Sequence, residues 1–197
     1  MKNIIFILGL ALFVSCKEAS KKEVIPQETE SAVQEIETLS AEPNKKKPLS
    51  PHTSAMAMVG DAHIHIDYSS PGVRKRMIFG GLLPYDAVWQ AGAHNATWIE
   101  TDKDLSIKGE KLPAGKYGFF VIPNKDQWTV IFNSNWNQHG KDDYDEKDDV
   151  LRFNVVPKIS EEIQEHLEYK VTETSKTSGT ISLNWEKVTI EFPFTVN

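Results

Sequence analysis

The 197-residue sequence contains a single cysteine, Cys16, and few basic residues for its length. One cysteine excludes a disulfide framework within the chain, and if Cys16 is used elsewhere no thiol remains for nucleophilic catalysis. The 22 Lys and Arg residues are outnumbered by 28 Asp and Glu, which gives a formal net charge of −6. Because no basic stripe is present either, this composition argues against a nucleic-acid partner.

The chain also lacks an apolar run long enough to span a bilayer, which needs about 20 residues. The run over residues 4–14 is shorter and follows one lysine, as is typical of a secretory signal segment. It ends in the letters FVSC, which resemble a bacterial lipobox, although Phe13 stands where Leu is usual. We therefore expect a lipoprotein signal peptide over residues 1–15 and a lipidated Cys16.

Lipidation predicts a place in the bacterial cell envelope, with the protein held to the outer membrane by its acyl chains. Whether it faces the periplasm or the cell surface is left open by the sequence. Residues 16–52 contain no aromatic side chain and are rich in Lys, Glu, Ser and Pro. Such a segment buries too little apolar surface to offset its ordering entropy, which predicts a flexible tether.

Residues 53–197 have the pattern of one all-β domain. In the segment 62–68, Ala62, Ile64, Ile66 and Tyr68 alternate with polar residues, which is typical of a half-buried strand. Further strands are predicted at 96–101, 105–108, 117–122, 128–133, 150–156, 167–174, 180–185 and 188–196.

Turn residues separate the predicted strands at 108–110 and 113–115. We expect Glu186 and Lys187 to form the turn of the last hairpin. The spacing of Ile159, Ile163 and Leu167 allows at most one short helix, near residues 160–165. About nine short strands with close turns predict a single β-sandwich of jelly-roll or immunoglobulin-like type.

Two long segments carry specific motifs: YSSPGVRKRMIFGGLLPYDAVWQAGAHNAT, which begins at Tyr68, and KGEKLPAGKYGFFVIPNKDQWTVIFN, which begins at Lys108. Together they resemble the domain of unknown function 2911 family of secreted proteins and lipoproteins of Bacteroidetes-type bacteria. The resemblance covers residues 61–196 and implies a β-sandwich-like envelope protein, with no activity to transfer. Residues that match the family pattern are Tyr68, Ser69, Pro71, Val73, Arg76, Trp89, Gly92, Ala93, Ala96, Thr97, Gly140, Tyr144 and Asp145.

The departures from the family pattern are at polar positions. Ser70 and Gln90 each stand where an arginine is usual, and His94 stands for Asn, Asn95 for Glu and His139 for Trp. If the family binds a ligand at these positions, the resemblance implies that the ligand of this chain differs or that the function is lost.

Three alternating residues, His63, His65 and Asp67, lie on one face of the first alternating strand. Two histidines in this pattern are a common way to present metal ligands, and His94 or His139 would complete such a divalent-metal site. The other interpretation is a solvent-facing side of a half-buried strand, which the alternate apolar residues already explain. The second interpretation is favoured, and no cofactor is expected.

The segment WQAGAHNAT, from Trp89 to Thr97, is the second candidate site. Its small residues allow close backbone approach, while Trp89, Gln90, His94 and Asn95 offer an aromatic wall and neutral polar groups. Such a composition suits a sugar or another small polar ligand. An ordinary loop in which the tryptophan fills the core is the alternative interpretation, and it is slightly favoured. Further candidate ligand-binding residues are Arg76, Trp136, His139 and Tyr144.

Three classes of function remain compatible with the sequence. The favoured one is a non-enzymatic, lipid-anchored β-sandwich that binds a small polar or glycan-like ligand or an envelope partner. The second is a metal-assisted enzyme that uses the strand and loop histidines. The third is a structural or assembly accessory domain.

Overall fold

The structure is a computed structural model that describes residues 48–197. The expected signal peptide, Cys16 and the tether up to residue 47 lie outside the described residues. Within the described range, no helix has both the length and the apolar character needed to cross a membrane.

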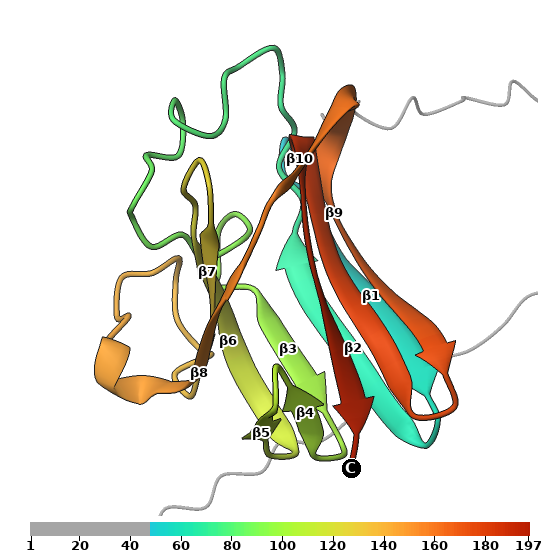
Figure 1. Cartoon of the computed structure of the whole chain (residues 1–197). Helices are drawn as coiled ribbons and strands as arrows, with labels where there is room; N and C mark the ends of the chain where they lie inside the picture. Colours follow the sequence, from blue (N-terminus) through green and yellow to red (C-terminus); the bar gives the residue numbers. More distant parts are fainter. Residues whose placement is uncertain (1–47) are drawn as a thin grey trace, which may run out of the picture. The chain divides into compact units, whose positions relative to one another are not determined.

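The domain consists of two antiparallel β-sheets that face each other in a sandwich, which confirms the predicted fold class (Figure 1). The larger sheet has the strand order β1-β2-β3-β6-β7-β8 and the smaller has the order β5-β4-β10-β9. The strands of the larger sheet are β1 (His52–Val59), β2 (Ala62–Ser69), β3 (Trp98–Thr101), β6 (Gly115–Ile122), β7 (Trp128–Asn133) and β8 (Asp149–Val155). The strands of the smaller sheet are β4 (Leu105–Ile107), β5 (Glu110–Leu112), β9 (Lys158–Ser175) and β10 (Ser178–Val196).

The core lies between the two sheets. It is formed by the apolar residues that alternate with polar ones along the strands. On β2, Ala62, Ile64 and Ile66 are fully buried, so the face predicted from the sequence is confirmed. The facing strand β10 contributes Phe192 and Phe194, each 1% exposed. Burial of each large apolar side chain stabilises the fold by about 1.5–3 kcal/mol.

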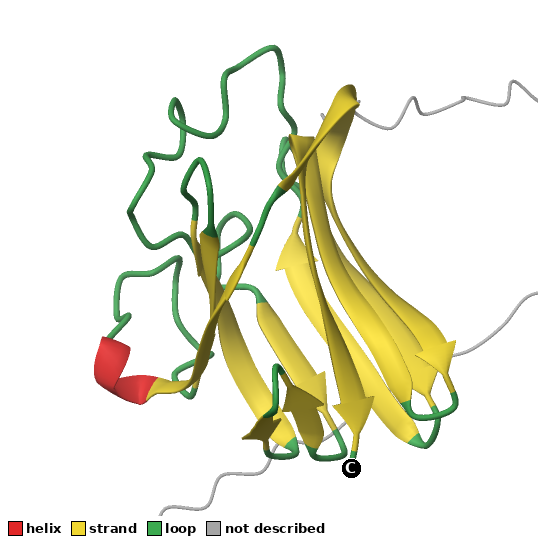
Figure 2. Cartoon of the chain, viewed as in Figure 1, coloured by secondary structure: helices red, strands yellow, loops and turns green. Residues whose placement is uncertain are grey.

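A second, smaller core lies on the outer face of the six-stranded sheet. Phe119 and Phe120 are consecutive residues of β6 and are both fully buried, although they point to opposite faces. Phe120 packs with Ala96 and Ile131 under the loops that precede β3 and follow β7. These loops, drawn in green in Figure 2, therefore cover part of the outer face and leave the part over β1, β2 and β3 to the site described below.

The sequence allowed at most one short helix, but its expected place near residues 160–165 is wrong, because this segment belongs to β9. Ile159 pairs with Val188, and Gln164 pairs with Glu186, both on β10. The spacing of four residues that suggested a helix also places side chains on one face of a strand, so it does not distinguish the two structures. The one short helix of the described range is a single 3₁₀ turn, η1 (Glu146–Asp148).

The predicted hairpin turn at Glu186 and Lys187 is also wrong, since β10 runs without a turn from Ser178 to Val196. The pairing of β10 with β9 shifts register on both sides of Glu186, whose φ angle is 57°. This irregularity is a β-bulge. The two polar residues that suggested a turn are therefore part of a bulge within one strand. Two strands, β1 and β5, were not predicted, and the two segments on either side of Glu186 form one strand.

Candidate functional site

The loop from Trp89 to Thr97 is fixed in place by buried hydrogen bonds. The backbone of Trp89 pairs with that of Val121 on β6, with N···O distances of 2.8 and 2.9 Å. The carbonyl of Ala91 accepts hydrogen bonds from Thr97 Oγ1 at 3.0 Å and from the buried Tyr169 hydroxyl at 2.7 Å. The loop is therefore a rigid support for whatever side chains it exposes.

Backbone geometry in this loop is unusual for its residue types. Ala91 and His94 have φ angles of 50° and 63°, in the left-handed region that few non-glycine residues occupy. Between them, Gly92 lies so close to Thr97 that an added Cβ would be 2.5 Å from the threonine Oγ1. Such conformations persist only where the surrounding structure enforces them, and they are common in functional loops.

The loop that follows β7 is attached to the first loop by backbone pairing. Asn95 and His139 form an isolated antiparallel bridge, and Gly140 N donates to His94 O at 2.8 Å. The sequence predicted that His94, Asn95 and His139 belong to one site, and the structure brings their backbones together. The His139 ring, however, is exposed and pairs with Asp142 at 3.1 Å.

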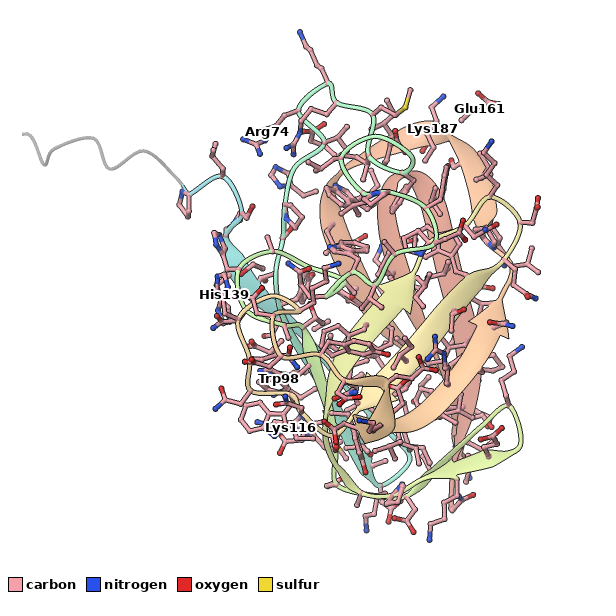
Figure 3. All side chains as sticks on the ribbon, turned by 90° about the vertical axis from the view of Figure 1, so that its left-hand side faces the viewer. Arg74, Trp98, Lys116, His139, Glu161 and Lys187 are labelled. Carbon is pink, nitrogen blue, oxygen red and sulfur yellow. The ribbon has the colours of Figure 1, made fainter. Side chains whose placement is uncertain are left out.

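Two half-buried tryptophans stand side by side on the outer face of the six-stranded sheet. The rings of Trp98 and Trp136 are 6.4 Å apart at an angle of 68°. Lys116 Nζ lies 3.8 Å from the Trp98 ring and 4.7 Å from the Trp136 ring, and it also pairs with Glu100 at 3.2 Å. Figure 3 shows Trp98 and Lys116 together on this face, with Arg74 at the opposite end of the domain.

A glycine on β6 makes this aromatic pair possible. An added Cβ at Gly118 would be 3.2 Å from both the Trp136 Cα and the Asn135 carbonyl oxygen. Because Gly118 also pairs with Trp98 across the strands, the bare backbone lets the loop after β7 approach the sheet beside Trp98.

The two tryptophans line a cavity of about 220 Å³, which we call the aromatic groove. Its polar lining includes the carboxylate of Asp67, which is bonded to His52 Nε2 at 2.9 Å. Its other principal polar side chains are His94, Asn95, Asn137 and Gln138. Hydrogen-bond donors and acceptors thus surround an aromatic surface in a site with little net charge.

The remaining predicted ligand residues lie elsewhere. Arg76, Trp89 and Gln90 line a separate cavity of about 300 Å³, which also touches His94. Trp89 is 5% exposed and stacks on Trp185 at 5.5 Å, so it is largely a core residue, as the alternative interpretation of this loop required.

The Tyr144 side chain has a structural role, because both its hydroxyl and its ring contact other parts of the domain. Its hydroxyl donates to Asp149 Oδ2 at 3.0 Å, and its ring packs on Phe120 at 5.0 Å. Burial, reinforced by the Asp149 carboxylate, raises the pKa of the Tyr144 hydroxyl well above its ordinary value. Tyr144 is thus a neutral anchor for the acidic loop at residues 141–149.

The candidate metal ligands lie on the outer face of β2, as the alternation predicted. The His63 and His65 rings are 6.2 Å apart, while Asp67 is engaged by His52. Among residues 48–197, no group of three His, Cys, Asp or Glu side chains has an arrangement that would hold a metal ion. His65 contacts the Trp98 ring at 4.8 Å instead.

Sequence reasoning missed several members of the groove, among them His52, Trp98, Asn137 and Gln138. His52 was assigned to the tether, but it begins β1 and pairs with Ser69 of β2 across the strands. Trp98 was not among the candidate site residues, yet it alternates with the buried Ile99 and shares its face with Glu100. That alternation was the signal that would have placed Trp98 on the outer face.

A family model described as "Protein of unknown function (DUF2911)" matches residues 50–194 of the chain, in agreement with the resemblance of the two long motifs. No curated protein and no solved structure matches the chain.

Proposed function

Because the chain belongs to the DUF2911 family, whose function is unknown, we propose a function from its own groove: the domain binds a saccharide there without catalysing a reaction. The observation that carries this proposal is the composition of the aromatic groove. Two half-buried indole rings line the same cavity as a carboxylate, an imidazole and several amide side chains.

Saccharides have apolar C–H faces and a rim of hydroxyl groups. Indole rings such as those of Trp98 and Trp136 match the faces, and side chains with both donors and acceptors match the hydroxyls. Asp67 and Asn95 supply acceptors, while Asn137 supplies amide donors and an acceptor. The Asp67 carboxylate is already hydrogen-bonded to His52 Nε2, and Lys116 is already paired with Glu100, which favours a neutral ligand.

The groove is also preorganised, which reduces the entropy that binding costs. Lys116 lies over both indole rings and holds them by cation–π contacts, each worth about 0.5–1 kcal/mol at an exposed site. The backbone pairing of Asn95 with His139 joins the two loops that line the groove, the loop before β3 and the loop after β7. A ligand therefore meets a wall that is already formed.

The test is a glycan array followed by calorimetric titration of the domain with soluble oligosaccharides (cello-, malto-, manno- and chito-oligosaccharides). Trp136→Ala is expected to weaken binding about 30-fold, since a central aromatic anchor contributes about 2 kcal/mol. Trp136→Phe keeps a ring and should retain most of the affinity. His139→Ala is the control, because this exposed side chain pairs only with Asp142 and does not line the groove.

Two results would overturn the proposal. The first is an array on which no saccharide is bound by the folded domain. The second is a bound saccharide whose affinity is unchanged in Trp136→Ala, which would place the contact outside the groove.

We further propose that the protein acts in the cell envelope, anchored through Cys16. The support is the signal-like run that ends in this single cysteine. In a bacterial host that processes lipoproteins, the full chain should incorporate an alkyne-labelled fatty acid and partition into detergent. Cys16→Ala should abolish both without changing the fold of residues 53–197. Labelling that persists in Cys16→Ala would contradict the anchor.

A further inference from the structure

A second cavity, at the end of the domain where Figure 3 shows Arg74, differs in chemistry from the aromatic groove. It has a volume of about 300 Å³, and we call it the basic cavity. Its lining includes Arg74, Arg76, Leu82, Trp89, Gln90 and Trp185. The two cavities share the side chain of His94 in their linings.

The two arginines of the basic cavity carry uncompensated charge. In the described part of the chain, neither Arg74 nor Arg76 has a carboxylate oxygen within 4.0 Å of its side-chain nitrogens. The nearby Glu165 carboxylate is bonded to the backbone N–H of Arg74 at 2.9 Å rather than to its guanidinium. In a protein of net charge −6, two unpaired arginines at one cavity favour an anionic ligand.

The guanidinium of Arg76 is held in a fixed position. Its Nε donates to Val73 O at 3.1 Å and its Nη2 donates to Gly72 O at 2.7 Å. A guanidinium has five N–H groups, so these two bonds leave three for a ligand. Because its orientation is already set, Arg76 loses little conformational freedom when it binds a carboxylate.

Leucine and tryptophan side chains form an apolar part of the cavity. Leu82 is 48% exposed, and the indole rings of Trp89 and Trp185 stack at 5.5 Å behind it. An adjoining cavity of about 220 Å³ shares Leu82, Trp89 and Gln90 with the basic cavity and extends the apolar surface. An occupant therefore needs an apolar body as well as a negative charge.

Trp185 carries a buried donor that has no partner within the domain. Trp185 is 1% exposed, and its Nε1 is, within residues 48–197, a buried side-chain polar atom with no hydrogen-bond partner. A buried donor without a partner costs about 1–3 kcal/mol. Trp185 lines the basic cavity, but its Nε1 has almost no accessible surface, so the ligand proposed below does not depend on this atom.

We propose that the basic cavity binds an organic carboxylate with an apolar body. The carboxylate pairs with Arg74 and the free N–H groups of Arg76, and the apolar body lies against Leu82 and Trp89. This site does not depend on the proposed saccharide groove, with which it shares only His94.

The experiment compares phenylacetate with phenylacetamide, which has the same ring but no charge, and with acetate, which has the charge but no ring. Calorimetric titration should show phenylacetate binding at least about tenfold more tightly than either, since a charge-assisted pair and the ring contact both contribute. Arg74→Gln and Arg76→Gln should each weaken phenylacetate about tenfold. Lys125→Gln removes the same charge from an exposed residue outside the cavity lining and should leave the affinity within twofold.

Arg76→Gln also removes two loop contacts, so its fold is checked by circular dichroism. If it unfolds, Leu82→Asp replaces it, because this half-exposed position tolerates a polar residue and the new carboxylate would repel the ligand. Trp136→Ala separates the two sites: it should leave phenylacetate binding unchanged even if no saccharide binds at all.

The proposal is overturned if phenylacetate does not bind, or if phenylacetamide binds as tightly. It is also overturned if the affinity for phenylacetate is unchanged in Arg74→Gln and in the second variant. Tighter binding of inorganic phosphate than of phenylacetate would overturn the assignment of an apolar carboxylate.

Discussion

The aromatic groove and the basic cavity are neighbours that share His94. They differ in whether their charged side chains already have partners within the domain. At the groove, Asp67 is paired with His52, and Lys116 is paired with Glu100. At the basic cavity, neither arginine has a carboxylate oxygen of the described residues within 4.0 Å of its guanidinium nitrogens. Both cavities have tryptophan walls, so the aromatic residues alone do not distinguish them.

The difference shows that pairing, rather than the number of charges, indicates the ligand class. A charge that already has a partner gains little from a second one, and displacing the first partner has its own cost. The groove therefore suits a neutral, hydroxyl-rich ligand, and the cavity suits an anion. The four predictions below test this comparison, from the largest expected effect to the smallest.

Gly118→Val should have the largest effect and should affect only the groove. Its side chain would begin 2.8 Å from the Phe120 ring and 3.2 Å from the Trp136 Cα. Overpacking of this kind costs about 1–3 kcal/mol and would move the loop that carries Trp136. Thermal unfolding and the two titrations should show a less stable domain that has lost saccharide binding but keeps phenylacetate binding.

Gly109→Asn is the matched control for this glycine. An added Cβ at Gly109 meets nothing within 4 Å, and Asn tolerates its φ angle of 87° better than other side chains do. Both titrations should therefore be unchanged. Equal losses in both cavities for Gly118→Val would contradict the independence of the two sites.

Alkaline pH should destabilise the loops behind both cavities. Burial raises the pKa of the Tyr169 hydroxyl well above its ordinary value of 10.0, and burial with Asp149 raises that of Tyr144. Above pH 10, the unfolded chain loses these protons while the folded chain keeps them, so the unfolded state binds fewer protons. The free energy of unfolding should therefore fall as the pH rises above 10, by up to about 1.4 kcal/mol per pH unit for the buried Tyr169 and by less for the partly exposed Tyr144.

Urea unfolding between pH 9 and pH 11 measures this dependence. The stability from each raised pKa is fully present below pH 10 and is lost as the pH approaches the folded-state pKa. Tyr169→Phe should make the decline shallower. A decline that is equally steep in this variant would show that Tyr169 is not the source.

Tyr169→Phe at neutral pH should have a moderate effect on both cavities. It removes the hydrogen bond to Ala91 O, but the carbonyl keeps its bond from Thr97, so the cost is about 1 kcal/mol. Because Ala91 precedes His94, which lines both cavities, saccharide and phenylacetate should each bind a few-fold more weakly. Thr101→Val is the control, since its hydroxyl bonds only within its own turn, at Lys103.

Local patterns in the sequence were sufficient for the sandwich and for part of the site. The alternation of Ile64 and Ile66 with His63 and His65 identified both faces of β2, because a strand with one buried face repeats every two residues. The segment around Gly92 was identified as a candidate site from its small residues, although an ordinary loop was favoured.

The parts that sequence reasoning missed depend on pairing between distant segments. His52 joins Asp67 only because β1 folds back on β2 in a particular register. Arg76 and Gln90 were grouped with Trp136 because all are polar or aromatic residues in or near family motifs, but they lie on different cavities. Which loop covers which part of a sheet is set by long-range packing, which a one-dimensional pattern does not contain.

The smallest expected effect compares the two histidines of β2. The His65 ring contacts the Trp98 ring at 4.8 Å and an angle of 74°, so it supports one wall of the groove. His65→Ala should weaken saccharide binding a few-fold, in line with the 0.5–1.5 kcal/mol of such a ring pair. His63→Ala should change it by less than about twofold, since His63 is exposed and does not line the groove.

The same two variants separate the supporting role of His65 from the metal hypothesis. If His63 and His65 were a pair of metal ligands, each substitution would abolish stoichiometric Zn²⁺ binding, and the two would have equal effects. Unequal effects on saccharide binding, with no Zn²⁺ dependence of either, would identify His65 as part of the aromatic wall. Equal loss of one bound Zn²⁺ per chain in both variants would instead assign this face of β2 to a metal.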